Sequence, residues 1–194
     1  MTQKGVKIPE GTVTCSFSGI TGVSCRITDS EGNILLQTSD RGIKDTAKKS
    51  VTGELEFNSD SGELIYRISA QQKINITGGY YAIIEPGSGE QLYIVSQTSS
   101  FIDSEWLIKD ADSEESIASI EATGKISTFL RRNGLFRLFL PSDYEILNNN
   151  GERVGIISNS WVSSDYKVKL RDENPIKEVS TLAPVFIHLL ENNR

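Results

Sequence analysis

Apolar and polar residues alternate with a period of two along most of the chain, and short polar turns interrupt the alternation. This pattern is typical of β-strands that bury one face. Two such segments joined by a turn rich in Asp, Asn, Gly or Ser predict a β-hairpin. Five segments follow the pattern, namely Ser24–Ser39, Phe57–Ser69, Tyr81–Ser96, Leu107–Ala122 and Tyr144–Ser160. Five hairpins of one style predict an all-β meander.

Three further alternating segments, Thr12–Phe17, Leu135–Leu140 and Asp165–Leu170, bring the expected number of strands to about twelve. Residues 1–11 are expected to form a flexible N-terminal arm. Residues 40–52 are polar and lack periodicity, so we expect a long loop there. A chain of 194 residues suits one substantial core, and residues 12–194 are therefore expected to form a single domain.

The most continuously apolar segment is Thr181–Leu190, with the sequence TLAPVFIHLL. Ser180 or Thr181 suits the N-cap of a helix, and Pro184 is tolerated in a first turn. A helix that is apolar on every side is buried on every side, and this one is too short to cross a bilayer. We therefore predict a core helix at residues 181–190. A final buried strand is the alternative, because Val185–Ile187 is rich in strand-forming residues.

These elements together predict a mainly β fold, an antiparallel barrel of about twelve strands that is built from hairpins and encloses a C-terminal hydrophobic helix. A barrel of this size has an interior wide enough to hold more than its own side chains. Burial of five or six large side chains of the helix would contribute on the order of 10 kcal/mol before entropy is counted.

Composition and charge narrow the classes of function. The chain is 37% hydrophobic and 24% charged, as in ordinary soluble proteins. Its net charge of −6 argues against a nucleic-acid partner. No apolar run approaches the ~20 residues of a membrane span, and the N-terminus lacks the apolar core of a signal peptide. We therefore expect a cytoplasmic protein without a transmembrane segment.

The charges are unevenly distributed along the chain. Residues 103–121 contain seven acidic residues and one basic residue, whereas residues 125–171 contain eight basic and four acidic residues. The basic residues at the start of the second stretch alternate with Phe129, Leu130, Phe136 and Phe139. Cationic groups beside apolar side chains suit an anionic lipid headgroup or a phosphorylated ligand. The predicted ligand-binding residues are Lys125, Arg131, Arg132 and Arg137, and the alternative is a solvated turn at Arg131–Gly134.

One acidic segment and one histidine are candidates for a metal or catalytic site. Asp110 to Glu121 places oxygen ligands at positions typical of a calcium loop, but the sixth position is Glu115 where a glycine is needed. An acidic hairpin turn explains the same residues without a metal. His188 is the only histidine, and no sequence motif supplies catalytic partners for it, so a hydrogen-bonded core residue is the favoured interpretation.

Cys15 and Cys25 flank a predicted turn at Gly19–Gly22. A four-residue loop would place Cys15 opposite Arg26, so a disulfide would require a bulge, and we favour free thiols. Phosphate-binding glycine loops, nucleophile elbows and CxxC pairs are absent from the sequence. The sequence therefore predicts a protein that is not an enzyme, with no catalytic residues, no metal and no cofactor.

Several segments in the C-terminal two thirds of the chain resemble the tubby C-terminal-like superfamily, which includes phospholipid scramblases and the plant LURP-one-related proteins. The resemblance rests on the hairpins Ile108–Glu115 and Ile146–Ile157, the segment Ser160–Val168 and the apolar C-terminal segment. It implies a twelve-stranded barrel with a C-terminal helix through its centre, and tubby domains bind phosphoinositides. The loop Arg171–Pro175 lacks the acidic spacing of the scramblase calcium segment, so calcium regulation is not implied.

The leading functional hypothesis is a non-enzymatic barrel that binds a ligand or partner, with peripheral recognition of anionic phospholipid headgroups at a membrane surface. The second is a structural or protein-interaction module without a small ligand. The third, which the absence of catalytic motifs disfavours, is an enzyme that uses a pocket in the barrel.

Overall fold

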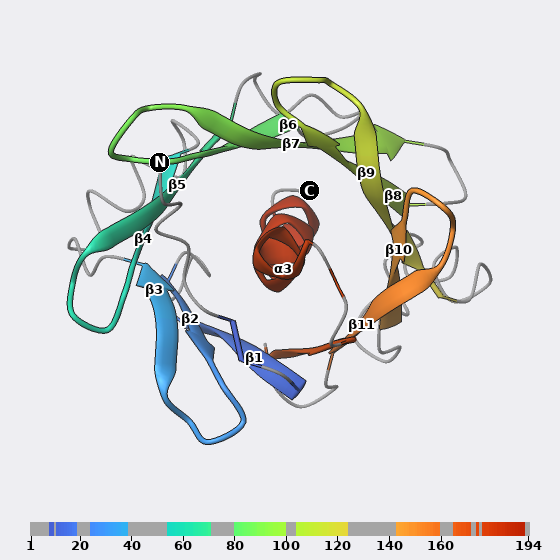
Figure 1. Ribbon diagram of the computed structural model, residues 1–194. Coiled ribbons are helices and arrows are strands. Elements are labelled where there is room, and N and C mark those ends of the chain that lie inside the picture. Colours follow the sequence, from blue (N-terminus) through green and yellow to red (C-terminus); the bar gives the residue numbers. More distant parts are fainter. Residues whose placement is uncertain are drawn as a thin grey trace.

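A computed structural model of the chain describes residues 8–9, 11–18, 24–38, 54–70, 80–99, 104–123, 143–159, 165–171, 174 and 176–192. Twelve antiparallel strands form a closed barrel around one helix, as the view along the barrel shows (Figure 1). The strands are β1 (Gly11–Ser18), β2 (Ser24–Thr28), β3 (Ile34–Thr38), β4 (Glu54–Asn58), β5 (Leu64–Ala70), β6 (Tyr80–Ile84), β7 (Gln91–Ser99), β8 (Ser104–Asp110), β9 (Ser116–Ala122), β10 (Asp143–Asn148), β11 (Arg153–Asn159) and β12 (Tyr166–Leu170). The helix is α3 (Lys177–Asn192).

Each strand pairs with its neighbours in the sequence, so all five predicted hairpins are confirmed. The barrel closes where β1 pairs with β12, with Val13 opposite Val168. This contact joins residues near the two ends of the chain. Closure satisfies the backbone groups that the edge strands of an open sheet would leave exposed.

The turns of all five hairpins contain a residue of positive φ two positions before the second strand. That residue is a glycine in four hairpins, at Gly32, Gly62, Gly89 and Gly151. In the β8–β9 hairpin it is Glu114, with φ of 57°. Glycine has no Cβ and adopts this conformation without steric cost, so the turn glycines are explained by local backbone chemistry.

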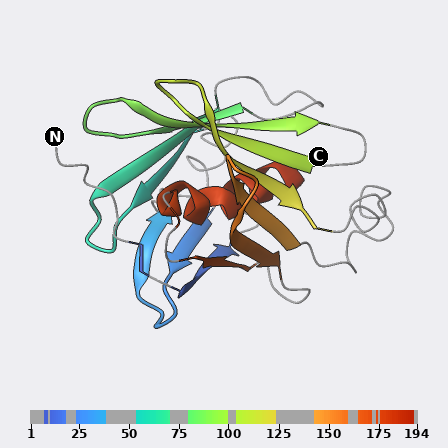
Figure 2. The same cartoon turned by 45° about the vertical axis from the view of Figure 1, so that its right-hand side comes forward.

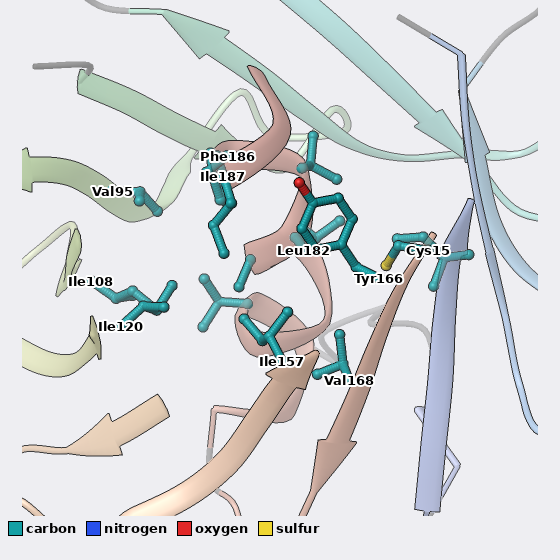
Figure 3. Packing of buried hydrophobic residues seen from close by; sticks show 14 of the residues in the cluster. Cys15, Val95, Ile108, Ile120, Ile157, Tyr166, Val168, Leu182, Phe186 and Ile187 are labelled. Carbon is teal, nitrogen blue, oxygen red and sulfur yellow. The ribbon is translucent and has the colours of Figure 1, made fainter. Parts of the chain in front are cut away.

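Alternate residues of each strand point inward and form one core with the helix. On β1, for example, Val13 and Cys15 are buried while Thr12 and Thr14 lie on the outer face. Figure 3 shows Phe186 and Ile187 of α3 near side chains from the barrel wall, among them Val95. Strands distributed around the barrel thus share one hydrophobic core.

The central helix is confirmed, and it lies inside the barrel in both ribbon views (Figures 1 and 2). Ten consecutive residues, 179–188, are buried, as expected for a helix without a polar face. The strand alternative for Val185–Ile187 is wrong. The helix begins at Lys177, earlier than predicted. Its first two residues, Lys177 and Glu178, are charged and only half-buried, so the apolar run did not mark them.

The predicted cap of the helix is also wrong. Neither Ser180 nor Thr181 begins the helix, because the carbonyl of Ile176 accepts the first helical hydrogen bond, from the N–H of Ser180 at 3.0 Å. Just before the helix, the side-chain oxygen of Asn174 accepts the backbone N–H of Ile176 at 2.9 Å. Pro184 consequently lies in the helix interior and not in the first turn. A proline at this position has no N–H to donate to the carbonyl of Ser180, four residues earlier.

Two local predictions at the N-terminus are corrected. Ile8 belongs to the predicted flexible arm, yet it is buried against the core. Cys15 lies opposite Ile27, not Arg26, because Ser18 pairs with Ser24 and the connection is one residue longer than expected. Both cysteines are free, as predicted. The turn Gly19–Gly22, the loop at 40–52 and the strand Leu135–Leu140 lie outside the described residues.

Candidate functional site

The interior of the barrel is occupied by α3 and by apolar side chains. Besides the two thiols, the buried polar or charged side chains among the described residues are Thr38, Asn174, Ser180, Thr181 and His188. Buried tyrosines and a buried tryptophan, which are largely apolar, add one polar atom each. No buried Asp, Glu, Lys or Arg is found in that part of the chain. The interior is therefore a packed core, and groups that carry charge lie on the outer surface.

His188 belongs to an aromatic cluster near the C-terminal end of the helix. Its ring stacks on Phe17 with centroids 3.8 Å apart and planes 10° apart. Tyr166 meets both rings edge-on, with its ring centroid 5.7 Å from Phe17 and 6.1 Å from His188. The side chain of His188 is only 8% exposed. This packing gives His188 a structural role that links α3 to β1 and β12.

Cys15 provides a second contact between the wall and the helix. Its thiol donates to the carbonyl oxygen of Thr181, with a sulfur-to-oxygen distance of 3.6 Å. Burial, reinforced by the neighbouring Cys25 and Asp165, raises the pKa of the Cys15 thiol well above its ordinary value. Burial also raises the pKa of Cys25. Since nucleophilic cysteines need a lowered pKa, both thiols have the chemistry of core residues.

The acidic hairpin at Asp110 is organised by its own backbone. One carboxylate oxygen of Asp110 accepts the N–H groups of Asp112 and Ser113, at 3.1 and 2.9 Å, and the Ser113 hydroxyl at 3.0 Å. The hydrogen bond from the Ser113 backbone is the main cause that lowers the pKa of Asp110. In the described residues, no three His, Cys, Asp or Glu side chains gather in a way that would hold a metal ion.

The four ligand-binding residues predicted from the sequence, Lys125, Arg131, Arg132 and Arg137, lie outside the described residues. The prediction made for them therefore stays a prediction. Arg153, Lys167 and Lys169, which belong to the same basic stretch of the sequence, are described, and all three are exposed.

Charges on the barrel wall are segregated by strand. The five adjacent strands β11, β12, β1, β2 and β3 contain no Asp or Glu. Their charged residues are all basic, namely Arg26, Arg153, Lys167 and Lys169. We call the outer face of these five strands the basic wall. In Figure 1 it is the side that carries β1, β2, β3 and β11, facing β6 and β7 across the barrel.

The other seven strands have the opposite character. They contain seven acidic and two basic residues, namely Glu54, Glu56, Glu105, Asp110, Glu121, Asp143 and Glu145 against Arg67 and Lys109. A net charge of −6 for the whole chain therefore conceals a barrel with one basic side. Such an arrangement attracts anionic partners to one side of the protein despite its overall negative charge.

The cations at the centre of the basic wall are available to a ligand. Arg26, Lys167 and Lys169 are exposed, and within the described ranges none of them forms an ion pair. Arg153 differs, because it binds Glu145 of β10 at 2.9 Å. Between the free cations, β1 presents the hydroxyl groups of Thr12, Thr14 and Ser16 on the same outer face. The candidate site is thus a surface of ammonium, guanidinium and hydroxyl donors.

The sequence contained part of this signal. The alternation of Lys167 and Lys169 in a strand places both on one face, and Arg171 continues the alternation. Arg26 was missed, because it lies more than a hundred residues away in the sequence, and only the pairing of β1 with both β2 and β12 brings it to the same side.

Comparison with solved structures finds a similar fold in a plant protein. A crystal structure of a protein from Arabidopsis thaliana, AT5G01750, superposes with a TM-score of 0.55. The match covers 94% of this chain and 92% of that one, at 12% sequence identity. At this identity the similarity extends to the fold alone.

No protein-family model matches the chain, and no curated protein matches it either. No helix in the described part of the chain is long and apolar enough to cross a membrane.

Proposed function

We propose that this protein is a non-enzymatic binding barrel that recognises anionic phospholipid headgroups at a membrane surface, as a peripheral cytoplasmic protein. The observation that carries the proposal is the basic wall, five adjacent strands without an acidic residue in a chain of net charge −6. The packed interior supports the proposal as well, because the charged groups that could bind a ligand lie on the outer surface of the barrel.

The fold supports the wider family proposal. A closed twelve-stranded barrel with a central C-terminal helix is the architecture that the resemblance to the tubby C-terminal-like superfamily implies. We propose membership of that superfamily, close to the LURP-one-related proteins and scramblases, on this architecture and on the sequence segments that resemble it.

The strength of such binding follows from electrostatics. A Lys or Arg near an anionic membrane contributes about 1 kcal/mol, and this attraction decreases with salt. Lys167 and Lys169 together would therefore contribute about 2 kcal/mol, equivalent to about a thirtyfold change in affinity. Reversal of both charges is expected to weaken binding by at least this factor.

Flotation of the full chain with phosphatidylserine-containing vesicles tests the proposal, with phosphatidylcholine vesicles as the neutral reference. We expect co-flotation with the anionic vesicles at low salt, and its loss in the variant Lys167→Glu with Lys169→Glu. Lys109→Glu, on β8 in the acidic part of the wall, is the matched control and should still float. Arg131→Glu with Arg132→Glu examines the patch predicted from the sequence. Absence of wild-type co-flotation at low salt would refute lipid recognition.

A protein-interaction module is the second proposed function, since the same basic wall suits an acidic protein surface. It predicts that an affinity pull-down with the wild-type chain recovers a stoichiometric acidic partner when anionic vesicles do not bind. The partner should be lost with the Lys167 and Lys169 reversals and kept with Lys109→Glu.

A further inference from the structure

One row of residues that crosses the centre of the basic wall contains one cation among three hydroxyl groups. Strand pairing places Ser158 of β11, Lys167 of β12, Thr14 of β1 and Thr28 of β2 directly opposite one another in that order. All four lie on the outer face, because the residues beside them in each strand, such as Val168, are buried. The ammonium group of Lys167 is therefore flanked by a hydroxyl on each side.

Two more cations border this row. Lys169 lies two residues farther along β12, about 7 Å from Lys167 along the strand, and opposite Thr12. Arg26 lies opposite Ser16, and so it is a diagonal neighbour of Thr14 across β1 and β2. Long Lys and Arg side chains cover such separations, so the three cationic groups are able to converge over Thr14.

Two acidic residues lie at the margins of this arrangement. Asp165 directly precedes β12, two residues before Lys167 on the same side of the alternation and about 7 Å away along the chain, on the side opposite to Lys169. Asp143 of β10 lies directly opposite Ser158, and it is therefore two strand spacings, about 10 Å, from Lys167. A carboxylate there limits how far an anion is drawn toward β10. The most favourable position for a ligand is consequently over β12 and β1, beside Thr14 and between Lys167 and Lys169, away from both carboxylates.

We propose that this row is a binding site for a phosphomonoester group, which deepens the proposed function and rests on it. A phosphomonoester carries a charge of about −1.5 to −2 at neutral pH and three strong acceptor oxygens. Lys167, Lys169 and Arg26 balance that charge, while the hydroxyl groups of Thr14 and Ser158 donate hydrogen bonds to the oxygens. A phosphodiester has a single charge and fewer terminal oxygens, so the row favours the monoester.

The group has two sources with the same chemistry, a lipid headgroup that ends in a phosphomonoester or free phosphate in solution. Vesicles containing phosphatidic acid present the monoester, and vesicles containing phosphatidylglycerol present a diester. The two vesicle preparations are matched to equal surface potential, so that general electrostatic attraction is the same. Inorganic phosphate, titrated into the full-length ¹⁵N-labelled chain and followed by NMR, tests the soluble source.

We expect roughly fivefold tighter binding to phosphatidic acid than to phosphatidylglycerol at matched potential, from hydrogen bonds to the charged phosphate. Thr14→Val removes the hydroxyl with little change in shape and should abolish this preference while binding to phosphatidylglycerol persists. Thr14→Ser restores the hydroxyl and should keep the preference. Lys167→Gln should weaken binding to both vesicles by about fivefold. Far-UV circular dichroism verifies that each variant is folded.

The outcomes separate this site from the wider function. Equal binding to the two matched vesicles, with Thr14→Val behaving as wild type, would overturn the phosphate site and leave anionic lipid recognition standing. Absence of binding to either vesicle, with no NMR response to phosphate, would overturn both. Phosphate-induced shifts of the Thr14, Ser158 and Lys167 amides without vesicle binding would support the site, with soluble phosphate as its source, and refute the lipid proposal.

Discussion

Truncation of Phe186 at the centre of the barrel tests the role of the helix as the core. The Phe186 side chain is fully buried, and its ring lies 5.6 Å from that of Tyr81 at an angle of 49°. In Phe186→Ala the surrounding side chains come from a hydrogen-bonded closed wall, which limits how far they collapse into the space. Phe→Ala changes in cores cost about 3–5 kcal/mol. This is a large part of the roughly 5–15 kcal/mol that stabilises a typical domain.

Urea unfolding followed by far-UV circular dichroism measures this loss, and thermal unfolding gives an independent value. For a chain of this size, each kcal/mol lowers Tm by about 2–4 °C, so a decrease of roughly 6–20 °C is expected. Phe186→Leu removes less buried volume and should therefore cost less than Phe186→Ala. Lys169→Ala on the exposed face should change stability by less than about 0.5 kcal/mol.

A loss below about 1 kcal/mol for Phe186→Ala would refute the central-helix core, since such a value is typical of surface positions. Truncation after Ser180 provides a second measurement, because it removes most of the buried helix. A chain that stays folded and soluble after this truncation would contradict the same reasoning.

Two further predictions concern the turns and the thiols. Glu114→Gly should stabilise the protein by about 0.5 kcal/mol, because glycine adopts the positive φ of this position without strain. Gly151→Ala should destabilise it by about 1 kcal/mol for the converse reason. A lower urea midpoint for Glu114→Gly would contradict the expected stabilisation. Burial raises the pKa values of Cys15 and Cys25 above the ordinary 9.0 in the folded state. Above pH 9 the thiols therefore ionise only in the unfolded state. The free energy of unfolding should fall there by about 1.4 kcal/mol per thiol for each pH unit, and these thiols should not change it below pH 9. Urea unfolding at pH 8 and pH 10 measures this effect. From pH 8 to pH 10 the free energy of unfolding of Cys15→Ala with Cys25→Ala should decrease by about 3 kcal/mol less than that of the wild type. Equal decreases would show that the thiols do not contribute.

The strands and hairpins were predictable because their determinants are local. Each turn places Asp, Asn, Ser or Gly between two alternating segments, and residues such as Gly32 and Gly151 supply the positive φ that the turn needs. The helix boundaries were less predictable. Hydrophobicity marks only what is buried, and it therefore gave no sign of the charged helix start at Lys177 and Glu178 or of the hydrogen bond that Asn174 accepts just before it.

The candidate site, in contrast to the hairpins, was not predictable from local sequence. Clustering in sequence predicts a site at Arg131 and Arg132, which lie outside the described residues. The basic wall instead combines Arg26 of β2 with Lys167 and Lys169 of β12. No sequence window contains both groups. Pairing of β1 with both strands creates the surface, and this pairing depends on barrel closure.

The sequence alone thus determined the elements of this protein, namely the hairpins, their turns and the helix that has no polar face. It also determined that Lys167 and Lys169 lie on one side of their strand, since alternation is a property of the strand itself. Only the tertiary structure decided which strands meet when the barrel closes, and hence that the acid-free strands lie together. The physical reason is that strand pairing is set by hydrogen bonds and packing between residues that are distant in sequence, such as Val13 and Val168, and these leave no local pattern.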